Sequence, residues 1–335
     1  MNEPVAVLGA GSWGTALAVH CGRVGLDVRL WGRDPALMAS IVNLGRNERY
    51  LPDVVVGPSV RSTASIEEAL AGEPLVLAAV PSHGMRHVLR QARPFLATGA
   101  VIVSATKGLE ADSLARMSRV IGEELPGHPV AVLSGPSFAV EVARGLPTAV
   151  VVASTDAAAA ARVQERLKGP ALRLYASDDV AGVEFGGALK NVIAIAAGVV
   201  EGLGLGHNAM AALITRGLVE MSRLACAEGS RRETLAGLSG LGDLVLTCTG
   251  NLSRNRHVGI ELGRGRALPE ILAGTRMVAE GVRTTGAALA LGRRHGVELP
   301  LAAQMAAVLD GRTTALSAVD ALMLRPQRSE RDGLA

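Results

Sequence analysis

The stretch Gly9-Ala-Gly-Ser-Trp-Gly14 decides the fold of the first half of this chain. It follows the apolar run Val5–Leu8 and opens a predicted helix at Thr15–Val19. A strand, a glycine-rich turn and a helix start, in that order, form the fingerprint of a dinucleotide-binding βα unit. Its glycines permit a tight turn, close approach of a pyrophosphate, and close helix packing. The helix N-terminus would offer N–H groups to the phosphates. A glycine-rich turn that binds nothing is the alternative.

Working outward, apolar runs alternate with helical patterns up to about residue 175. Such alternation is typical of βαβ units and of a mainly parallel sheet covered by helices on both faces. We therefore predict a Rossmann-like α/β domain over residues 1–177. The predicted strands are Val5–Leu8, Val28–Trp31, Leu75–Val80, Val101–Ser104, Val130–Leu133 and Ala149–Ala153.

Strand signals fade after Asp178, where long segments rich in Ala, Leu and Val begin. We expect an all-α C-terminal domain over residues 178–335, with a mobile tail from about residue 325. The predicted helices cover residues 180–201, 208–228, 256–263, 284–295 and 301–310.

The composition excludes several classes of protein. The net charge of +3 is too small to indicate binding to nucleic acid or to an anionic membrane. No apolar run reaches the ~18 residues of a membrane span, and the first strand begins too early to leave room for a signal peptide. Cys21, Cys226 and Cys248 show no C-x-x-C pairing, which favours a cytoplasmic protein without disulfides or structural zinc. Cys248 is expected to be a small core residue.

Ligands in open parallel sheets lie beyond the carboxyl ends of the strands. Three further predicted strands end in polar turns, namely Pro81–His83, Ala105–Gly108 and Ser134–Phe138. Together with the glycine turn they outline one polar crevice. We expect His83 to be hydrogen-bonded or solvated rather than catalytic.

The second predicted strand bears on the choice of cofactor. An NAD site usually carries an acidic residue about 20 residues past the fingerprint, to hold the ribose 2′-OH. Here Gly32 occupies that position and Arg33 follows it. Because an arginine can form charge-assisted hydrogen bonds with a 2′-phosphate, NADP(H) is favoured. Asp34 keeps NAD(H) possible, and a solvated helix start is the third interpretation.

Lysine is scarce, since arginine supplies 31 of the 34 basic residues. Unlike arginine, lysine can release its proton when its surroundings lower its pKa. Lys107 follows a strand of the predicted crevice, and Lys190 lies on an apolar helix, three residues after Gly187 and four after Gly186. Two helix glycines suit a close approach by a ligand or by another backbone. Lys190 is therefore a candidate general acid/base, the alternative being a lysine that reaches solvent from the helix edge.

A third cluster spans residues 238–256. Asp243 and Thr247 are four residues apart, so they share one face if the segment is helical. Asp243 could orient Lys190 or accept from a substrate hydroxyl. Ser253, Arg254 and Asn255 form a dense donor set suited to a phosphate, although such a stretch is also common in solvated basic turns.

Over nearly its whole length the chain resembles bacterial NAD(P)+-dependent glycerol-3-phosphate dehydrogenases. The motifs that carry the resemblance are Gly9–Ala18, Lys107–Glu110, Ser134–Ala139, Leu189–Asn191, Gly242–Asp243, Ser253–Arg256 and Glu280–Arg283.

The resemblance implies reversible reduction of dihydroxyacetone phosphate to sn-glycerol 3-phosphate for phospholipid synthesis, by a cytoplasmic homodimer. It implies that Lys190 is the general acid/base and that Lys107 and Asp243 assist catalysis. The expected substrate contacts are Lys107, Gly135, Ser137, Lys190, Asn191, Asp243, Thr247, Ser253, Arg254 and Asn255. The expected cofactor contacts are Gly9, Gly11, Ser12, Trp13, Gly14, Arg33, Tyr50, Lys107, Ala139, Arg254, Val278 and Glu280.

Two alternatives stay open at this point. A reductase of similar architecture could act on ketopantoate or a β-hydroxyacid, since a fold does not determine a substrate. A dinucleotide sensor without catalytic activity is the other, but it would give Lys190 and Asp243 no purpose.

Overall fold

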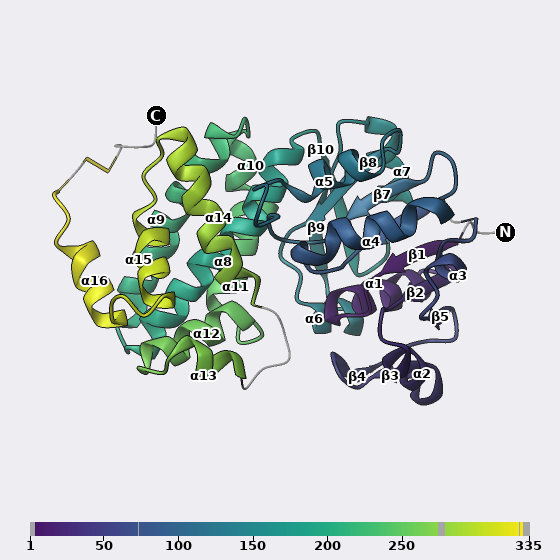
Figure 1. Cartoon of the computed structure of the whole chain (residues 1–335), viewed down its shortest axis with the longest axis horizontal. Coiled ribbons are helices and arrows are strands. Elements are labelled where there is room, and N and C mark those ends of the chain that lie inside the picture. The colour runs from purple at the N-terminus through teal and green to yellow at the C-terminus, as the bar shows by residue number, and fades with distance from the viewer. Residues whose placement is uncertain (1–3, 73, 274–278, 328, 331–335) are drawn as a thin grey trace. The chain divides into compact units, whose positions relative to one another are not determined.

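The structure is a computed structural model that describes residues 4–72, 74–273, 279–327 and 329–330. Its chain divides into two compact units (Figure 1). The first consists of Met1–Thr106 and Met117–Val180, and the second of Lys107–Arg116 and Ala181–Ala335. The sequence predicted one boundary, between residues 177 and 178, whereas the contacts also group residues 107–116 with the second unit.

An eight-stranded sheet forms the centre of the first unit, in the order β10-β9-β8-β7-β6-β1-β2-β5. Neighbouring strands are parallel except for the antiparallel pair β8 and β9. The strands of this sheet are β1 Val5–Leu8, β2 Val28–Trp31, β5 Val60–Thr63, β6 Leu75–Ala78, β7 Val101–Ser104, β8 Val130–Ser134, β9 Thr148–Ala153 and β10 Leu172–Ser177.

All six predicted strands are therefore confirmed. The missed strands β5 and β10 are the two edges of the sheet, and their half-exposed, polar-containing sequences lack the continuous apolar run of a central strand. A small antiparallel hairpin, β3 Arg46–Asn47 and β4 Leu51–Val55, was missed as well.

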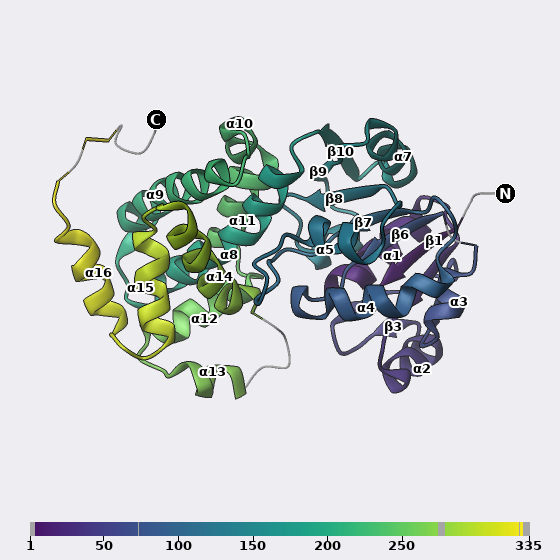
Figure 2. The same ribbon diagram turned by 45° about the horizontal axis from the view of Figure 1, so that its top comes forward.

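Helices cover both faces of the sheet (Figures 1 and 2), as the full burial of β1, β6 and β7 requires. These helices are α1 Ser12–Arg23, α2 Pro35–Leu44, α3 Ile66–Leu70, α4 Met85–Ala92, α5 Met117–Glu124, α6 Ala139–Arg144 and α7 Ala157–Leu167. Two 3₁₀ turns, η1 Ser82–Gly84 and η2 Arg93–Phe95, flank α4.

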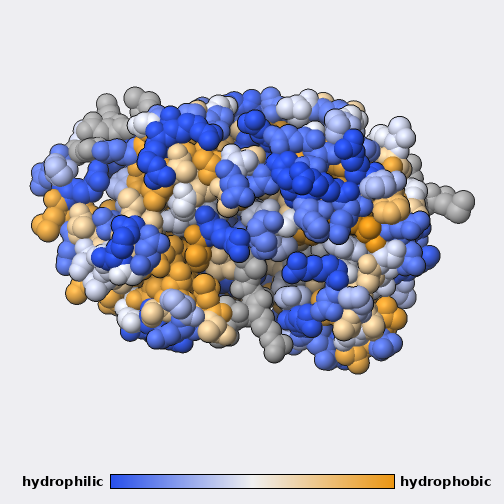
Figure 3. Space-filling view, in the orientation of Figure 1, coloured by the Kyte–Doolittle hydropathy of each residue, from blue (hydrophilic) through white to orange (hydrophobic). Residues whose placement is uncertain are grey.

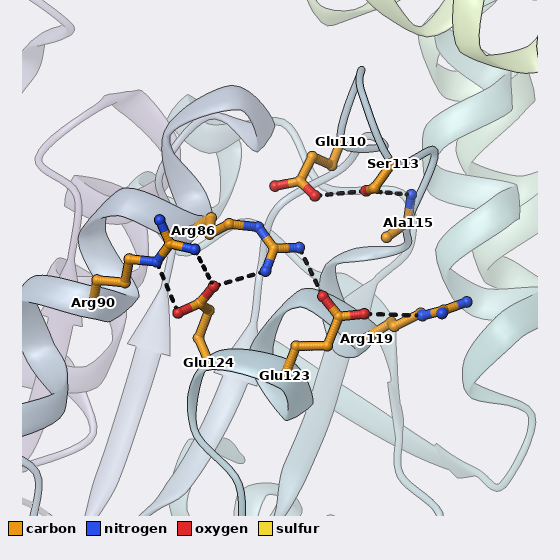
Figure 4. A network of polar contacts seen from close by, with 8 residues as sticks. All are labelled: Arg86, Arg90, Glu110, Ser113, Ala115, Arg119, Glu123 and Glu124. Carbon is orange, nitrogen blue, oxygen red and sulfur yellow. Dashed lines mark hydrogen bonds and ion pairs between the residues drawn. The ribbon is translucent and has the colours of Figure 1, made fainter.

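Helices α4 and α5 are joined by a network of ion pairs at the surface of the first unit (Figure 4). Arg86 bridges the two acidic residues at the end of α5, at 2.8 Å from Glu123 and 2.7 Å from Glu124. Arg90 adds a second contact to Glu124 at 2.9 Å. Because the partners are partly solvated, the network contributes modestly to stability.

Apart from residues 107–116, the described part of the second unit is built from helices. Its elements are α8 Val180–Gly202, α9 Gly206–Ala227, α10 Arg232–Ala236, the π-helical turn η3 Leu238–Gly242, α11 Asp243–Thr249, α12 Arg254–Gly263, α13 Leu268–Ala273, α14 Glu280–His295, α15 Pro300–Leu309 and α16 Ala315–Met323. The five predicted helices are confirmed, and so is the predicted succession of a Rossmann-like domain and an all-α domain.

Helix α8 is the central element of the second unit. Its length and composition alone would suit a membrane span, but its most apolar window is 100% buried inside the protein. Every residue from Gly182 to Val200 is buried. On the outer surface, Figure 3 shows hydrophobic residues gathered among polar ones over the helices of this unit.

Helices α8 and α12 touch backbone to backbone. A Cβ added to Gly198 would lie 2.0 Å from the carbonyl oxygen of Arg256, and one added to Gly259 would lie 1.9 Å from that of Ile195. Gly202 and Gly263 repeat the contact one turn later. This close crossing fixes the start of α12 against the helix that carries Lys190.

Candidate active site

The glycine turn has the geometry that the fingerprint requires. Gly9 has φ +116°, and a Cβ on Gly14 would lie 1.8 Å from the Gly9 carbonyl oxygen. Around Gly11, in contrast, nothing lies within 4 Å of such a Cβ. No side chain caps the N-terminus of α1. Open space at the second glycine, beside an uncapped helix start, fits a bound pyrophosphate.

A buried donor at the same turn also lacks a partner. The indole Nε1 of Trp13 is buried and has no hydrogen-bond acceptor within the described residues. A buried N–H without an acceptor is costly, so its presence fits a ligand group that accepts from it. Ser12 Oγ donates to the carbonyl oxygen of Tyr50 at 2.8 Å, which ties the turn to the β3–β4 hairpin.

Asn47 is a residue of this region that the sequence did not reveal. It is fully buried, and its amide donates to the Ala10 carbonyl oxygen at 2.9 Å and to Thr15 Oγ1 at 2.8 Å. These bonds hold both sides of the glycine turn. A lone asparagine between helix and hairpin gives no pattern that would distinguish it from a loop residue.

The surroundings of Arg33 bear on the nucleotide preference. Arg33 is exposed, and its side chain makes no hydrogen bond within the described residues. Asp34, in contrast, accepts from the Ala36 N–H at 3.0 Å and pairs with Arg49 at 2.6 Å. The pKa of the Asp34 carboxyl is lowered, and the hydrogen bond from the Arg49 guanidinium is the largest cause. Asp34 is thus engaged as a helix cap, whereas Arg33 is available for a ligand.

Gly32 cannot easily be replaced by the acidic residue of an NAD site. An added Cβ would lie 2.5 Å from the Met38 sulfur and 2.9 Å from the Ala10 Cβ. A side chain at this position would therefore require the Met38 side chain and Ala10, in the glycine turn, to move.

The second unit contains a buried cluster of charges. Lys190 Nζ, on α8, donates to Asp243 Oδ1 and, at 2.7 Å, to Thr247 Oγ1. Lys107 Nζ donates to the other carboxylate oxygen of Asp243 at 2.6 Å. The side chains of Lys190 and Asp243 are 8% and 1% exposed. Asp243 is thus shared by two lysines, and the alternative of a lysine reaching solvent is wrong.

The environment of Lys190 prepares it for proton transfer. Burial lowers the pKa of its ammonium to about 8, because a charged group is poorly solvated there. Asp243 raises this pKa and the positive charge of Lys107 lowers it. A group with a pKa near neutrality can both donate and accept a proton.

Lys190 keeps one donor for a ligand. An ammonium has three N–H bonds, and two of them are taken up by Asp243 and Thr247. Thr247 Oγ1 in turn donates to the Asp243 carbonyl oxygen at 2.6 Å, so the hydroxyl accepts from Lys190. Within the described residues the third N–H of Lys190 has no acceptor.

Close packing by η3 brings Asp243 to Lys190. A Cβ on Gly186 would lie 2.4 Å from the Ser239 carbonyl oxygen, so another backbone does approach α8 at this glycine, as predicted. Short π-helical segments are frequent at functional sites. Here η3 ends where Asp243 begins α11.

The start of α12 is hydrogen-bonded to the residue after Lys190. Asn255 Nδ2 donates to Asn191 Oδ1 at 3.0 Å, and Asn255 Oδ1 accepts from the Gly281 N–H at 3.0 Å. Ser253 caps α12 by accepting from the Arg256 N–H at 3.2 Å. The structure thus brings the predicted residues of α8, α11 and α12 into one region.

Arg254 is the cation at this helix start. Its side chain is exposed, yet the surrounding protein lowers the pKa of the guanidinium by desolvation, while Glu280 raises it. Within the described residues the guanidinium donates no hydrogen bond. A partly desolvated guanidinium without an acceptor among the described residues, beside a helix N-terminus, suits an anion.

The other predicted residues are distributed as follows. Gly135, Ser137 and Ala139 lie after β8 in the first unit, where Ser137 Oγ donates to the Gly135 carbonyl oxygen at 2.9 Å, and their ligand contacts stay predictions. Val278 lies outside the described residues. His83 is exposed in η1, and Cys248 is a buried free thiol, as expected. Among the described residues no His, Cys, Asp and Glu group could hold a metal.

Comparison with known proteins assigns the family. The model of the NAD-dependent glycerol-3-phosphate dehydrogenase N-terminus matches residues 4–160, and that of its C-terminus matches residues 179–320. The chain belongs to this family. It is 54% identical to a glycerol-3-phosphate dehydrogenase (NAD(P)+) from Acidobacterium capsulatum, over 97% of this chain and 99% of that one.

Solved structures agree. The crystal structure of glycerol-3-phosphate dehydrogenase from Coxiella burnetii has a TM-score of 0.94 and 42% identity, covering 97% of this chain and 99% of that chain. A ketopantoate reductase from Ralstonia eutropha, at 19% identity, a TM-score of 0.58 and coverage of 92% and 99%, shares the fold alone.

Proposed function

We propose that this family member reduces dihydroxyacetone phosphate reversibly to sn-glycerol 3-phosphate with NAD(P)H, which supplies the backbone of phospholipids. The observation that carries the proposal is the buried cluster of Lys107, Asp243 and Lys190, in a chain that matches both parts of the family model. A protein that only sensed a dinucleotide would have no use for such a cluster.

When bound, the nicotinamide supplies the hydride. Lys190, as an ammonium, donates its proton to the carbonyl oxygen as the alkoxide forms, and as a neutral amine it takes the proton back in the reverse direction. Asp243 and Thr247 hold Nζ in place. The charge of Lys107 adds to the stabilisation of the developing oxyanion.

Arg254 and the start of α12 are proposed to bind the substrate phosphate. The guanidinium has no acceptor within the described residues, and the helix N-terminus presents N–H groups to an anion. The bonds from Asn255 to Asn191 and Gly281 connect this region to the helix of Lys190.

We further propose that NADP(H) is preferred to NAD(H), because the Arg33 side chain has no hydrogen-bond partner within the described residues, while Asp34 is engaged by Arg49 and by α2. We also propose a cytoplasmic homodimer, which light scattering coupled to size-exclusion chromatography would test.

The test of the main proposal is NADPH oxidation with dihydroxyacetone phosphate, unphosphorylated dihydroxyacetone and ketopantoate. We expect a kcat/KM for dihydroxyacetone phosphate at least about a hundredfold above the others, since the phosphate contacts assist catalysis. A preference for ketopantoate would instead indicate a ketoacid reductase that shares this fold.

A further inference from the structure

The segment that carries Lys107 folds as a small closed hairpin, residues 107–116. Leu109 and Arg116 face each other as an antiparallel bridge at its base. The Glu110 N–H donates to the Ala115 carbonyl oxygen at 2.9 Å, and Ser113 Oγ donates to the Glu110 carboxylate at 2.5 Å (Figure 4). The hairpin is therefore a rigid unit whose position depends on how its base is held.

Two contacts hold this base on α8. Leu109 is 4% exposed and belongs to the same apolar core as Phe185 and Leu189. Arg116 Nη1 donates to Glu184 Oε2 at 2.6 Å, and the Glu184 side chain is only 3% exposed. Breaking an ion pair that has a buried partner is costly, because the buried charge is then left without compensation.

The same helix carries both Glu184 and Lys190. The two residues are six positions apart, which corresponds to about 9 Å along a helix. Lys107, two residues from the base of the hairpin, reaches Asp243 with a side chain that is 18% exposed. Its position relative to Lys190 thus depends on the contact between the hairpin base and α8.

We propose that the Arg116–Glu184 ion pair is a positioning device for the catalytic cluster: it holds the base of the hairpin on α8 and so keeps Lys107 on Asp243 beside Lys190. The inference rests on the proposed function and adds two residues to it that are not among the expected substrate and cofactor contacts. Arg116 and Glu184 act through Lys107.

Loosening the pair has a predictable direction. When Lys107 leaves Asp243, the carboxylate serves Lys190 alone, and a positive charge is withdrawn from the neighbourhood of Lys190. Both changes raise the pKa of Lys190, since Asp243 raises it and Lys107 lowers it. Oxidation of glycerol 3-phosphate requires the neutral amine, so the pH at which its kcat is half-maximal moves upward.

The experiment compares Arg116→Gln and Glu184→Gln with the wild-type enzyme. Positioning predicts that both variants move the midpoint of the kcat profile upward, by about half a pH unit or more. A direct charge effect predicts opposite directions, because removing an arginine raises the pKa of Lys190 whereas removing a glutamate lowers it. Opposite shifts, or unchanged midpoints in folded variants, overturn the proposal.

A variant that conserves the charge gives a second way to separate the positioning effect from the direct effect of charge on the pKa of Lys190. Glu184→Asp keeps the carboxylate but withdraws it by one methylene, so positioning still predicts an upward shift and a pure charge effect predicts none. This milder variant also decides the question if a glutamine variant fails to fold, as judged by circular dichroism.

Arg266→Gln is the matched control. Arg266 pairs with the 10%-exposed Glu261 at 2.6 Å in the same unit and has no hydrogen bond or ion pair with the hairpin, so the midpoint of this variant should stay at the wild-type pH. The outcomes also distinguish the two proposals. A wild-type enzyme inactive on dihydroxyacetone phosphate refutes the proposed function, whereas an active enzyme with unmoved variants refutes only the positioning role.

Discussion

Three cations of this protein keep hydrogen-bond donors that the described residues do not use. Lys190 donates two of its three N–H groups to Asp243 and Thr247, and the third has no acceptor among the described residues. Arg33 and Arg254 donate none within the described residues. Arg116, in contrast, is paired with Glu184. Donors that the protein leaves unused are the ones that a ligand can take, and they carry the first three predictions.

Lys190→Met should abolish turnover while leaving NADPH affinity, measured by fluorescence titration, nearly intact. In the wild-type enzyme burial lowers the pKa of Lys190 to about 8. Oxidation of glycerol 3-phosphate should therefore rise with pH through about 8, because it needs the amine. Reduction of dihydroxyacetone phosphate should fall over the same range, because it needs the ammonium. Near-normal turnover of Lys190→Arg in both directions would leave lysine only a role as a charge.

Arg33→Ala should weaken NADPH binding by about 1.5–3 kcal/mol, the value of hydrogen bonds to a charged group. NADH has no 2′-phosphate, so its affinity should barely change. Dissociation constants for both cofactors check this, with Arg61→Ala as a control on a side chain that is 71% exposed. Equal losses for the two cofactors would contradict a role of Arg33 in recognising the phosphate.

Arg254→Ala should lower kcat/KM for dihydroxyacetone phosphate, by an amount that corresponds to about 2–4 kcal/mol of lost transition-state stabilisation, because the phosphate loses a charge-assisted partner. The decisive quantity is the ratio of kcat/KM between dihydroxyacetone phosphate and dihydroxyacetone. This ratio should fall in the variant. If it does not, the phosphate is bound elsewhere, whatever happens to the absolute rates.

At the scale of the elements, helix α8 organises the site because its neighbours approach it through glycines. Backbone of η3 packs at Gly186, and α12 packs at Gly198. Each approach delivers a functional side chain, Asp243 from one and Asn255 from the other. The contacts that pack these elements on α8 therefore also set the positions of the side chains in the site.

Gly259→Ala should accordingly lower the free energy of unfolding by about 1–3 kcal/mol or more, since its Cβ would overlap the Ile195 carbonyl oxygen. It should also raise KM for dihydroxyacetone phosphate by displacing Asn255. Gly286→Ala is the control, because nothing lies within 4 Å of its Cβ and an exposed helix position gains about 1 kcal/mol from alanine. Denaturant unfolding followed by circular dichroism measures both; an unaffected Gly259→Ala would disprove the tight crossing.

At the scale of the whole molecule, stability should depend on pH through a buried acid in the helical unit. Glu220, on α9, accepts from the N–H groups of Leu301 and Ala302 at 2.8 Å each, at the start of α15. Burial raises the pKa of Glu220 to about 7, although these two bonds lower it. The folded chain thus keeps a proton that the unfolded chain releases.

Between about pH 4.5 and 7 this difference should lower the free energy of unfolding as the pH rises, by at most about 3 kcal/mol. The loss should be complete above pH 7 and absent below about 4.5. Glu220→Gln should remove the slope, and Glu261→Gln, whose parent carboxyl has its pKa lowered by Arg266, should leave it unchanged. Unfolding should be followed by circular dichroism rather than by tryptophan fluorescence. Both tryptophans, Trp13 and Trp31, lie in the first unit, whereas Glu220 lies in the second. A slope that persists in Glu220→Gln would assign it to another group.

The sequence predicted the central elements and pointed to Lys190 as a site residue, because both leave local signals. Continuous apolar runs mark buried strands, and the rarity of lysine singled out Lys190. The sequence could not reveal Asn47 or Glu184, since a buried polar residue is defined by partners distant in the chain. For the same reason it predicted Lys107 at a strand end but not that its segment joins the helical unit.

The placement of residues 107–116 has a consequence for the order of events during synthesis. The ribosome completes the hairpin 133 residues before Thr249, the last residue of α11, so at roughly 5–20 residues per second it waits on the order of ten seconds for its partners. Until α8 has been synthesised, Leu109 has no helical core to enter and Arg116 has no Glu184. A gene cut between codons 177 and 178 would yield a helical fragment that can never acquire Lys107, whereas the two halves supplied together could restore it.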